Sequence, residues 1–201
     1  MTIKTDLRIK KSKYAIEHAF WKLLLAEGFA KVTIQQIIDE AHVNRATLYK
    51  YYANKYELLD TVENSLISEF KNVTEKAPDL AKRTDVSQDR LHNYYREMVR
   101  YIYNNRDKFS ALLAPTGDPS FINKLITADR EIWQENNITQ YLPISEHYAS
   151  AAITGMVISL IVEWIKSDFK ESADEFMDVL QNTVTPLFSQ KTFLRRNNSA
   201  H

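Results

Sequence analysis

The stretch TIQQIIDEAHVNRATLYKYYANKYELL, residues 33–59, decides the fold of this 201-residue chain. It holds two short helical patterns separated by the three-residue turn HVN. The first opens on Thr33 and Gln36, whose spacing is that of a capping box, and its isoleucines fall on one face. Asn44 is the expected N-cap of the second, at 45–51. The pattern predicts a helix-turn-helix that spans roughly residues 33 to 52.

Longer helical patterns flank these two short ones. Apolar residues recur at helical spacing from about Ser12 until Gly28, which is suited to a left-handed helix end. Asn54, with Glu57 three positions later, starts a helix that runs through Phe70. Because helices of seven or eight residues are unstable alone, we expect the longer helices to clamp them into a three-helix unit with a following linker helix.

The rest of the chain also favours helices. Gly (3 residues) and Pro (5) are scarce, which argues against a sheet-based fold. We expect a seam in the polar stretch around Pro78 and further helices at about 88–104, 108–113, 120–140, 145–167 and 171–188. The prediction is an all-α protein with an N-terminal helix-turn-helix domain at 8–68, joined by the linker helix to a helical domain at 69–201.

The residue inventory gives no indication of catalysis. The absence of cysteine excludes disulfides and thiolate metal sites and is compatible with a reducing cytoplasm. The five histidines form no His-x-x-x-His ligand pair, and the sequence has no Gly-rich phosphate loop and no signal-peptide pattern. We expect a cytoplasmic bacterial protein that is not an enzyme, with no catalytic residue, cofactor or metal site.

The net charge of zero conceals an asymmetry. Residues 1–55 carry ten Lys or Arg against five Asp or Glu, whereas the remainder carries 16 basic and 21 acidic residues. A basic first segment on an acidic body suggests that one end meets a polyanion, although a swing of five charges also arises by chance. The helix at 45–51 offers basic, hydroxyl and aromatic side chains beside apolar Leu48 and Tyr52, and a helix of this kind fits the DNA major groove.

From about Ile9 to Phe70 the sequence resembles the TetR family of transcriptional regulators. The resemblance rests on the Gly28-Phe29 step, on Thr33-Ile34, and above all on TLYKYYANKYELL at 47–59, which is similar to the family's recognition helix and the start of its fourth helix. His42 stands in the turn where the family often has Gly, and His tolerates a left-handed backbone better than most residues.

The resemblance implies a homodimer that binds a palindromic double-stranded DNA operator, and by default a repressor released by an unknown small-molecule effector. It implies phosphate contacts from Thr33, Thr47, Tyr51 and Lys55, and positions near the bases for Arg45, Ala46, Tyr49 and Lys50. Residues 1–11 would form a loose basic arm that either follows the DNA or only solubilises the chain. The tyrosines could instead be packing residues and the cations ordinary solvated charges.

Beyond residue 88 no short motif stands out. The aromatic residues Tyr94, Tyr101, Phe109, Phe121 and Trp133 could line an effector pocket, although aromatic residues at helical spacing are more often core. The alternative to an operator-binding function is an adaptor that keeps the helix-turn-helix fold and binds a protein partner.

The segment 147–162 has no Asp, Glu, Lys or Arg and is apolar on nearly every side. It is too short and too interrupted by hydroxyl residues for a comfortable membrane span, so we expect no membrane association. A helix that is apolar all round needs a partner on each face. We therefore predict a dimer interface, the alternative being a fully internal helix of a monomer, from Ala151, Gly155, Ser159, Val162, Phe176 and Leu180.

Overall fold

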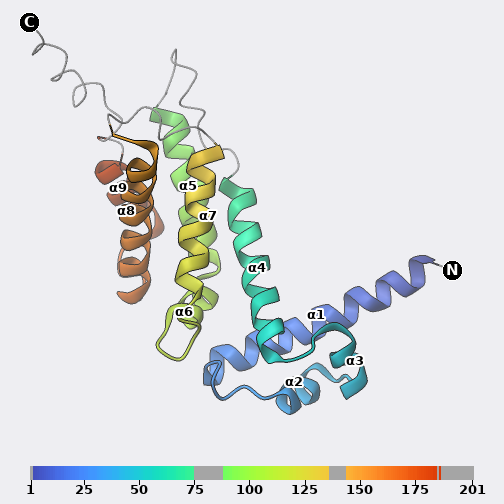
Figure 1. The fold of residues 1–201 in the computed structure, drawn as a ribbon. Coiled ribbons are helices and arrows are strands. Elements are labelled where there is room, and N and C mark those ends of the chain that lie inside the picture. Colours follow the sequence, from blue (N-terminus) through green and yellow to red (C-terminus); the bar gives the residue numbers. More distant parts are fainter. Residues whose placement is uncertain (1, 75–87, 136–143, 185, 187–201) are drawn as a thin grey trace, which may run out of the picture. The chain divides into compact units, whose positions relative to one another are not determined.

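The computed structural model describes residues 2–74, 88–135, 144–184 and 186, and within these ranges every regular element is a helix (Figure 1). The all-α prediction is confirmed. The helices are α1 Thr2–Glu27, α2 Ile34–Ala41, α3 Arg45–Tyr51, α4 Lys55–Thr74, α5 Gln88–Asn104, α6 Arg106–Leu113, α7 Phe121–Glu135, α8 Glu146–Lys166 and α9 Ala173–Val184. The predicted seam around Pro78 and the predicted continuation of α7 to residue 140 lie outside the described residues.

The chain divides into two compact units. The first comprises the residues up to Leu66 together with Asp107–Phe121, and the second comprises Ile67–Arg106 and the residues from Ile122 onward. The helix α4 therefore contributes its first part to one unit and its last turns to the other.

In the first unit, α1 packs on α2 and α3 through a core of Ile16, Phe20, Leu24, Ile37 and Leu48, each at most 1% exposed. The prediction of a loose arm at residues 1–11 is wrong, because α1 is helical from Thr2. Nothing in that segment interrupts a helix: it contains no Gly or Pro, and its lysines, leucine and isoleucine tolerate helical backbone well.

The segment 107–121 packs against the end of α1. Thr116 accepts a 3.0 Å hydrogen bond through its carbonyl oxygen from the backbone N–H of Phe29, and the ammonium of Lys108 lies 5.4 Å from the ring centroid of Trp21. Gly28 takes the left-handed conformation expected of it, with φ of 76°. A Cβ at Gly28 would lie 2.7 Å from that of Thr116, so the close approach also requires glycine.

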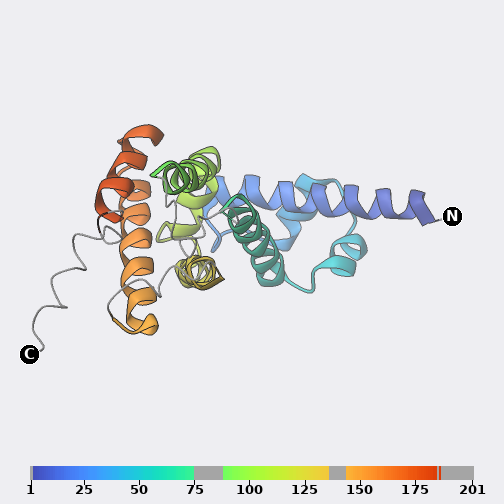
Figure 2. The ribbon, with the colours of Figure 1, turned by 90° about the horizontal axis from the view of Figure 1, so that it is seen from above.

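In the second unit, α9 packs against α5 and α8, and α8 and α9 run side by side (Figures 1 and 2). Trp164 of α8 stacks on Phe176 of α9 with ring centroids 4.1 Å apart. By length and composition α8 could cross a membrane, but half of its most apolar window is buried inside the protein, as in a core helix.

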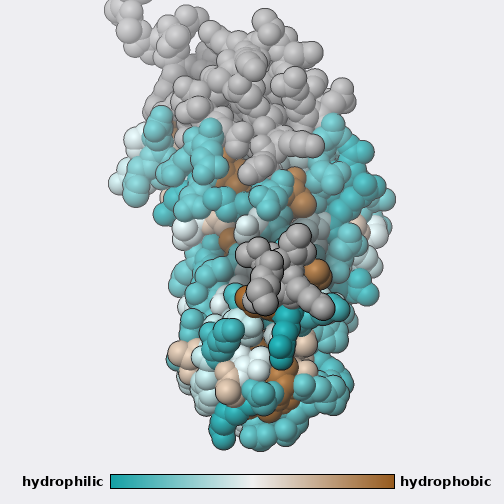
Figure 3. Space-filling model, turned by 90° about the vertical axis from the view of Figure 1, so that its right-hand side faces the viewer, coloured by the Kyte–Doolittle hydropathy of each residue, from teal (hydrophilic) through white to brown (hydrophobic). Residues whose placement is uncertain are grey.

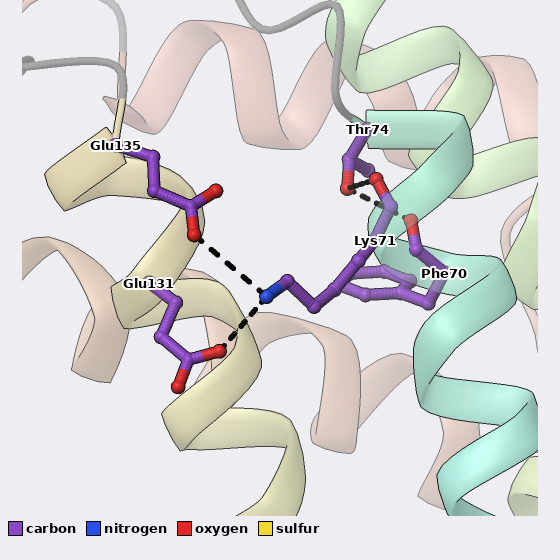
Figure 4. Close-up of polar contacts among 5 residues, drawn as sticks. All are labelled: Phe70, Lys71, Thr74, Glu131 and Glu135. Atoms are coloured by element: carbon purple, nitrogen blue, oxygen red, sulfur yellow. Dashed lines mark hydrogen bonds and ion pairs between the residues drawn. The ribbon is translucent and has the colours of Figure 1, made fainter.

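A polar contact joins the end of α4 to α7 within the second unit (Figure 4). The ammonium of Lys71 lies 2.9 Å from a carboxylate oxygen of Glu131 and 3.9 Å from one of Glu135. Thr74 ends α4 by donating its hydroxyl to the carbonyl oxygens of Phe70 and Lys71, at 2.8 and 2.9 Å.

Candidate nucleic-acid interface

Local capping interactions shape the α2–turn–α3 segment as the sequence predicted. Thr33 accepts from the backbone N–H of Gln36, whose side chain accepts in return from the backbone N–H of Thr33, so the capping box is complete. His42 ends α2 in the left-handed region, with φ of 53°. Asn44 caps α3 by accepting a 2.7 Å hydrogen bond from the N–H of Thr47. These caps satisfy helix-end N–H groups that would otherwise lack partners.

Two buried side chains fix α3 against α1. Leu48 is fully buried and Tyr52, at the C-terminal end of the helix, is 2% exposed. The hydroxyl of Tyr52 donates a 2.5 Å hydrogen bond to Glu17 of α1. Burial, and secondarily this hydrogen bond to a carboxylate, raises the pKa of Tyr52, so the phenol stays neutral and remains the donor. The rotation of α3 about its own axis is thereby determined.

The opposite side of α3 faces solvent. Arg45, Ala46, Tyr49 and Lys50 are exposed, and Thr47 and Tyr51 are half-buried. Hydrophilic residues, in teal, make up most of the described surface that Figure 3 shows. We call the six named residues the α3 ridge.

The cations of the α3 ridge lie beside aromatic rings. The guanidinium of Arg45 is 5.8 Å from the ring centroid of Tyr49, and the ammonium of Lys50 is 5.6 Å from that of Tyr51. Lys13 of α1 approaches the same Tyr51 ring at 5.8 Å. Among the residues that the structure describes, no carboxylate forms an ion pair with these three cations. Their positive charge is therefore available to an external anion.

Two other predicted DNA contacts already have intramolecular partners. The hydroxyl of Thr33 donates to Gln36 at 2.7 Å, in addition to its capping role. The ammonium of Lys55 bonds the carbonyl oxygens of Phe29, Ala30 and Val32 at 3.2, 3.4 and 2.9 Å. Lys55 thus holds the α1–α2 connection in place, a role that the sequence did not suggest.

Two family profiles match the sequence. The profile described as "Bacterial regulatory proteins, tetR family" matches residues 18–62, which include α2, α3 and the start of α4. The profile "Transcriptional regulator C-terminal region", of the same family, matches residues 89–186. The chain belongs to the TetR family of transcriptional regulators. The predicted family resemblance is confirmed, and it extends over both units.

Individual relatives of this TetR-family chain are distant. The HTH-type transcriptional regulator YxbF of Bacillus subtilis (strain 168) is 26% identical over 182 residues, but the chain spans only 46% of that protein's length. A TetR regulator from Streptococcus agalactiae 2603V has the same fold, with a TM-score of 0.68, 22% identity, and coverage of 92% of this chain and 99% of that one. NalD, the secondary repressor of the MexAB-OprM multidrug efflux pump in Pseudomonas aeruginosa, gives 0.66 at 18% identity, with 90% and 96% covered.

The remaining predicted sites concern the effector and the dimer. The described ring contacts join the predicted pocket aromatic residues in two pairs, one in each unit. Tyr94 and Trp133 meet edge to face in the second unit, with centroids 6.0 Å apart, whereas Phe109 and Phe121 pair at 6.0 Å in the first. Tyr101 donates its hydroxyl to Glu69 at 3.1 Å.

The predicted dimer residues also separate into two groups. Ala151, Gly155 and Ser159 are exposed along one side of α8, Val162 is half-buried, and a Cβ added at Gly155 would meet nothing within 4 Å. Phe176 and Leu180 instead lie in the core of the chain itself, 4% and 0% exposed. The small-residue row is therefore free to meet another surface.

The sequence reasoning missed Asp129. This carboxyl is fully buried on α7, among helix neighbours Leu125, Ala128 and Ile132 that are also buried. The available signal was an acidic residue within the apolar face of a helical pattern, where charged side chains are rarely fully buried unless paired.

Proposed function

We propose that this protein is a transcriptional repressor that binds a palindromic DNA operator as a homodimer, through the α3 ridge, and that a small-molecule effector releases it. The observation that carries the proposal is the α3 ridge itself: exposed Arg45 and Lys50 without carboxylate partners, on a helix whose rotation is fixed by Leu48 and Tyr52. A rigid helix with unpaired cations suits both phosphate contact and base readout.

In this proposal the residues of the α3 ridge contact different parts of the DNA. Arg45, Ala46, Tyr49 and Lys50 approach base edges, and Thr47 and Tyr51 bond backbone phosphates. Lys13 adds positive charge beside Tyr51. Thr33 and Lys55 act mainly by keeping α2 and the α1–α2 connection in shape, because their polar atoms are engaged within the chain.

The homodimer forms through the exposed row Ala151, Gly155 and Ser159 of α8, where small side chains permit close helix approach. Two recognition helices in such a dimer would enter successive major grooves if they lie about 34–36 Å apart. Effector binding in the second unit changes that separation through α4, which has residues in both units. Repression, as opposed to activation, follows from release by an effector and agrees with the role of the fold neighbour NalD as a repressor.

The test starts with genome-wide footprinting of the purified full-length protein to find its operator. Fluorescence anisotropy on that operator then compares wild type with Arg45→Ala and Lys50→Ala. We expect each variant to lose about 1–3 kcal/mol of binding free energy if the residue contacts a base, or to lower the salt slope by about 1 if it contacts a phosphate. Lys170→Ala removes a cation that is also exposed, but in the second unit, and should bind as wild type does. Failure to bind any DNA fragment at low salt would contradict the proposal and favour a protein-binding adaptor.

A further inference from the structure

Asp129 has an uncommon environment for a carboxylate. It is fully buried, and one of its oxygens accepts a 3.0 Å hydrogen bond from the indole N–H of Trp133, one turn further along α7. The other oxygen, Oδ1, has no hydrogen-bond partner. Within the described residues, no lysine, arginine or histidine forms an ion pair with it. An isolated buried carboxylate is costly, and natural proteins usually pair or neutralise it.

Five other buried polar atoms that lack hydrogen-bond partners belong to neighbouring helices. One is the Nε of Arg96 on α5, whose guanidinium forms no ion pair with Asp129. The others are the hydroxyl oxygens of Tyr94 and Tyr95 on α5 and of Ser150 and Thr154 on α8. Trp133, which donates to Asp129, also packs on Tyr94, and Tyr94 packs on Tyr95. Burial, and secondarily the charge of Asp129, raises the pKa of both tyrosines. Burial also raises the pKa of Asp129, and the side chain of Thr154 opposes that rise. Ser150 lies one turn before Thr154, and both are buried. We call Asp129 and these four hydroxyl residues the Asp129 cluster.

The Asp129 cluster combines one uncompensated acid with aromatic rings. Tyr94 lies 5.4 Å from Tyr95 and 6.0 Å from Trp133 between ring centroids. Aromatic faces attract cations, and more strongly where water is excluded. An ammonium group would provide what the chain itself does not: a positive charge for the carboxylate and N–H donors for Oδ1 and for the unpartnered hydroxyl oxygens of α8.

We propose that the Asp129 cluster is the recognition site of the effector, and that the effector is an organic amine bound as its ammonium ion. The role of the ligand as an effector rests on the proposed function. Binding of an amine by the Asp129 cluster does not, because it requires no DNA. Buried hydroxyls alone would suit a neutral polyol or alcohol equally well, and the unpaired Asp129 carboxylate is what favours the cation. The amine nitrogen donates to Asp129 Oδ1, and the apolar part of the ligand lies against Tyr94 and Trp133.

The experiment measures binding of matched probes to the full-length protein without DNA, by isothermal titration calorimetry and by the shift in Tm. The probes are ethylamine, benzylamine and 3-phenylpropylamine, each compared with the alcohol that replaces its ammonium with a hydroxyl. We expect at least one amine to bind about tenfold or more tightly than its alcohol, the ratio expected for one charge-assisted hydrogen bond.

Two variants localise the effect. Asp129→Asn keeps the shape of the side chain and should abolish the preference for the amine. Glu131→Gln removes an exposed carboxylate two positions away on α7 and should leave the preference intact. Equal binding of amine and alcohol, no Tm shift with any amine, or a preserved preference in Asp129→Asn would each overturn the proposal. Since no DNA is present, failure here is separate from failure of operator binding, which the footprinting tests without any amine.

Discussion

The two units of the molecule differ in how the polar groups at their candidate sites are satisfied. In the first, the side chains that shape the helix-turn-helix find partners nearby: Thr33 with Gln36, Tyr52 with Glu17, and Lys55 with three carbonyl oxygens. Its unpaired charges, such as Arg45, are exposed to solvent. The second unit buries one oxygen of a carboxyl, the Nε of Arg96 and four hydroxyls without hydrogen-bond partners. A surface that must meet a fixed DNA helix benefits from internal rigidity, whereas unsatisfied buried groups indicate a place where a ligand can supply what is missing.

The largest expected effect concerns the pH dependence of stability. Burial raises the pKa of Asp129 from 3.8 to about 7, opposed by the side chain of Thr154 and by the hydrogen bond from Trp133. Because the pKa of Asp129 is higher in the folded than in the unfolded state, the contribution of this group to stability is fully present below about pH 4. That contribution is lost as the pH rises to about 7. The loss from this group is about 4 kcal/mol at pH 8. Tyr94 and Tyr95, whose pKa values burial raises further, stay neutral throughout.

Asp129→Asn should remove that loss. Urea unfolding at pH 4 and pH 8 gives the change in unfolding free energy between the two pH values for each protein. The difference between the wild-type change and the variant change is the contribution of Asp129. Glu131→Gln, on the exposed side of the same helix, should retain the wild-type pH dependence. If Asp129→Asn loses as much stability as wild type between the two pH values, the pKa of Asp129 is not raised by burial. The difference proposed between the two units would then be wrong.

The second prediction is that a substitution at Gly28 destabilises the first unit. Gly28→Ala places a methyl group at φ of 76° and 2.7 Å from the Cβ of Thr116. We expect a loss of about 2 kcal/mol or more in unfolding free energy, because the left-handed backbone alone costs ~1–2 kcal/mol. Lys31→Ala is the control, since it removes an exposed side chain from the same connection between α1 and α2 and places no atom near Thr116. Equal effects of the two substitutions, measured by urea unfolding, would show that the Gly28–Thr116 contact does not constrain the unit.

The same contrast explains what the sequence could predict. The helix-turn-helix follows from neighbours three or four residues apart, so Asn44, the capping box and the left-handed His42 were predictable, and α3 begins and ends where expected. The Asp129 cluster joins α5, α7 and α8, and the contact of Gly28 with Thr116 joins residues far apart in the chain. Such pairings depend on tertiary packing, which no local pattern encodes. For the same reason, Phe176 and Leu180 could not be distinguished from interface residues.

The third prediction separates two roles of Thr33. Thr33→Ala removes both the capping hydroxyl of α2 and a predicted phosphate contact, while Thr33→Ser keeps the hydroxyl. Loss of the cap should cost about 1 kcal/mol in unfolding free energy. Circular dichroism melts of both variants measure this loss, and anisotropy on the operator measures DNA affinity. If Thr33→Ala leaves stability unchanged but weakens operator binding, the hydroxyl serves the DNA and not the cap.

The smallest effect tests whether exposed ion pairs matter in the second unit. Lys71→Met keeps the hydrophobic stem but removes the ammonium that lies between Glu131 and Glu135 (Figure 4). Both carboxylates are about half exposed or more, so water and salt screen the pair, and we expect a loss below about 1 kcal/mol that vanishes in 1 M NaCl. We expect Glu131→Gln to reproduce most of this loss and Glu135→Gln almost none of it. The 2.9 Å distance from Lys71 to Glu131 permits a hydrogen bond, whereas the 3.9 Å distance to Glu135 does not. A salt-independent loss comparable to that of Gly28→Ala would contradict this expectation, because it would show that the ammonium of Lys71 does not act as a screened surface charge.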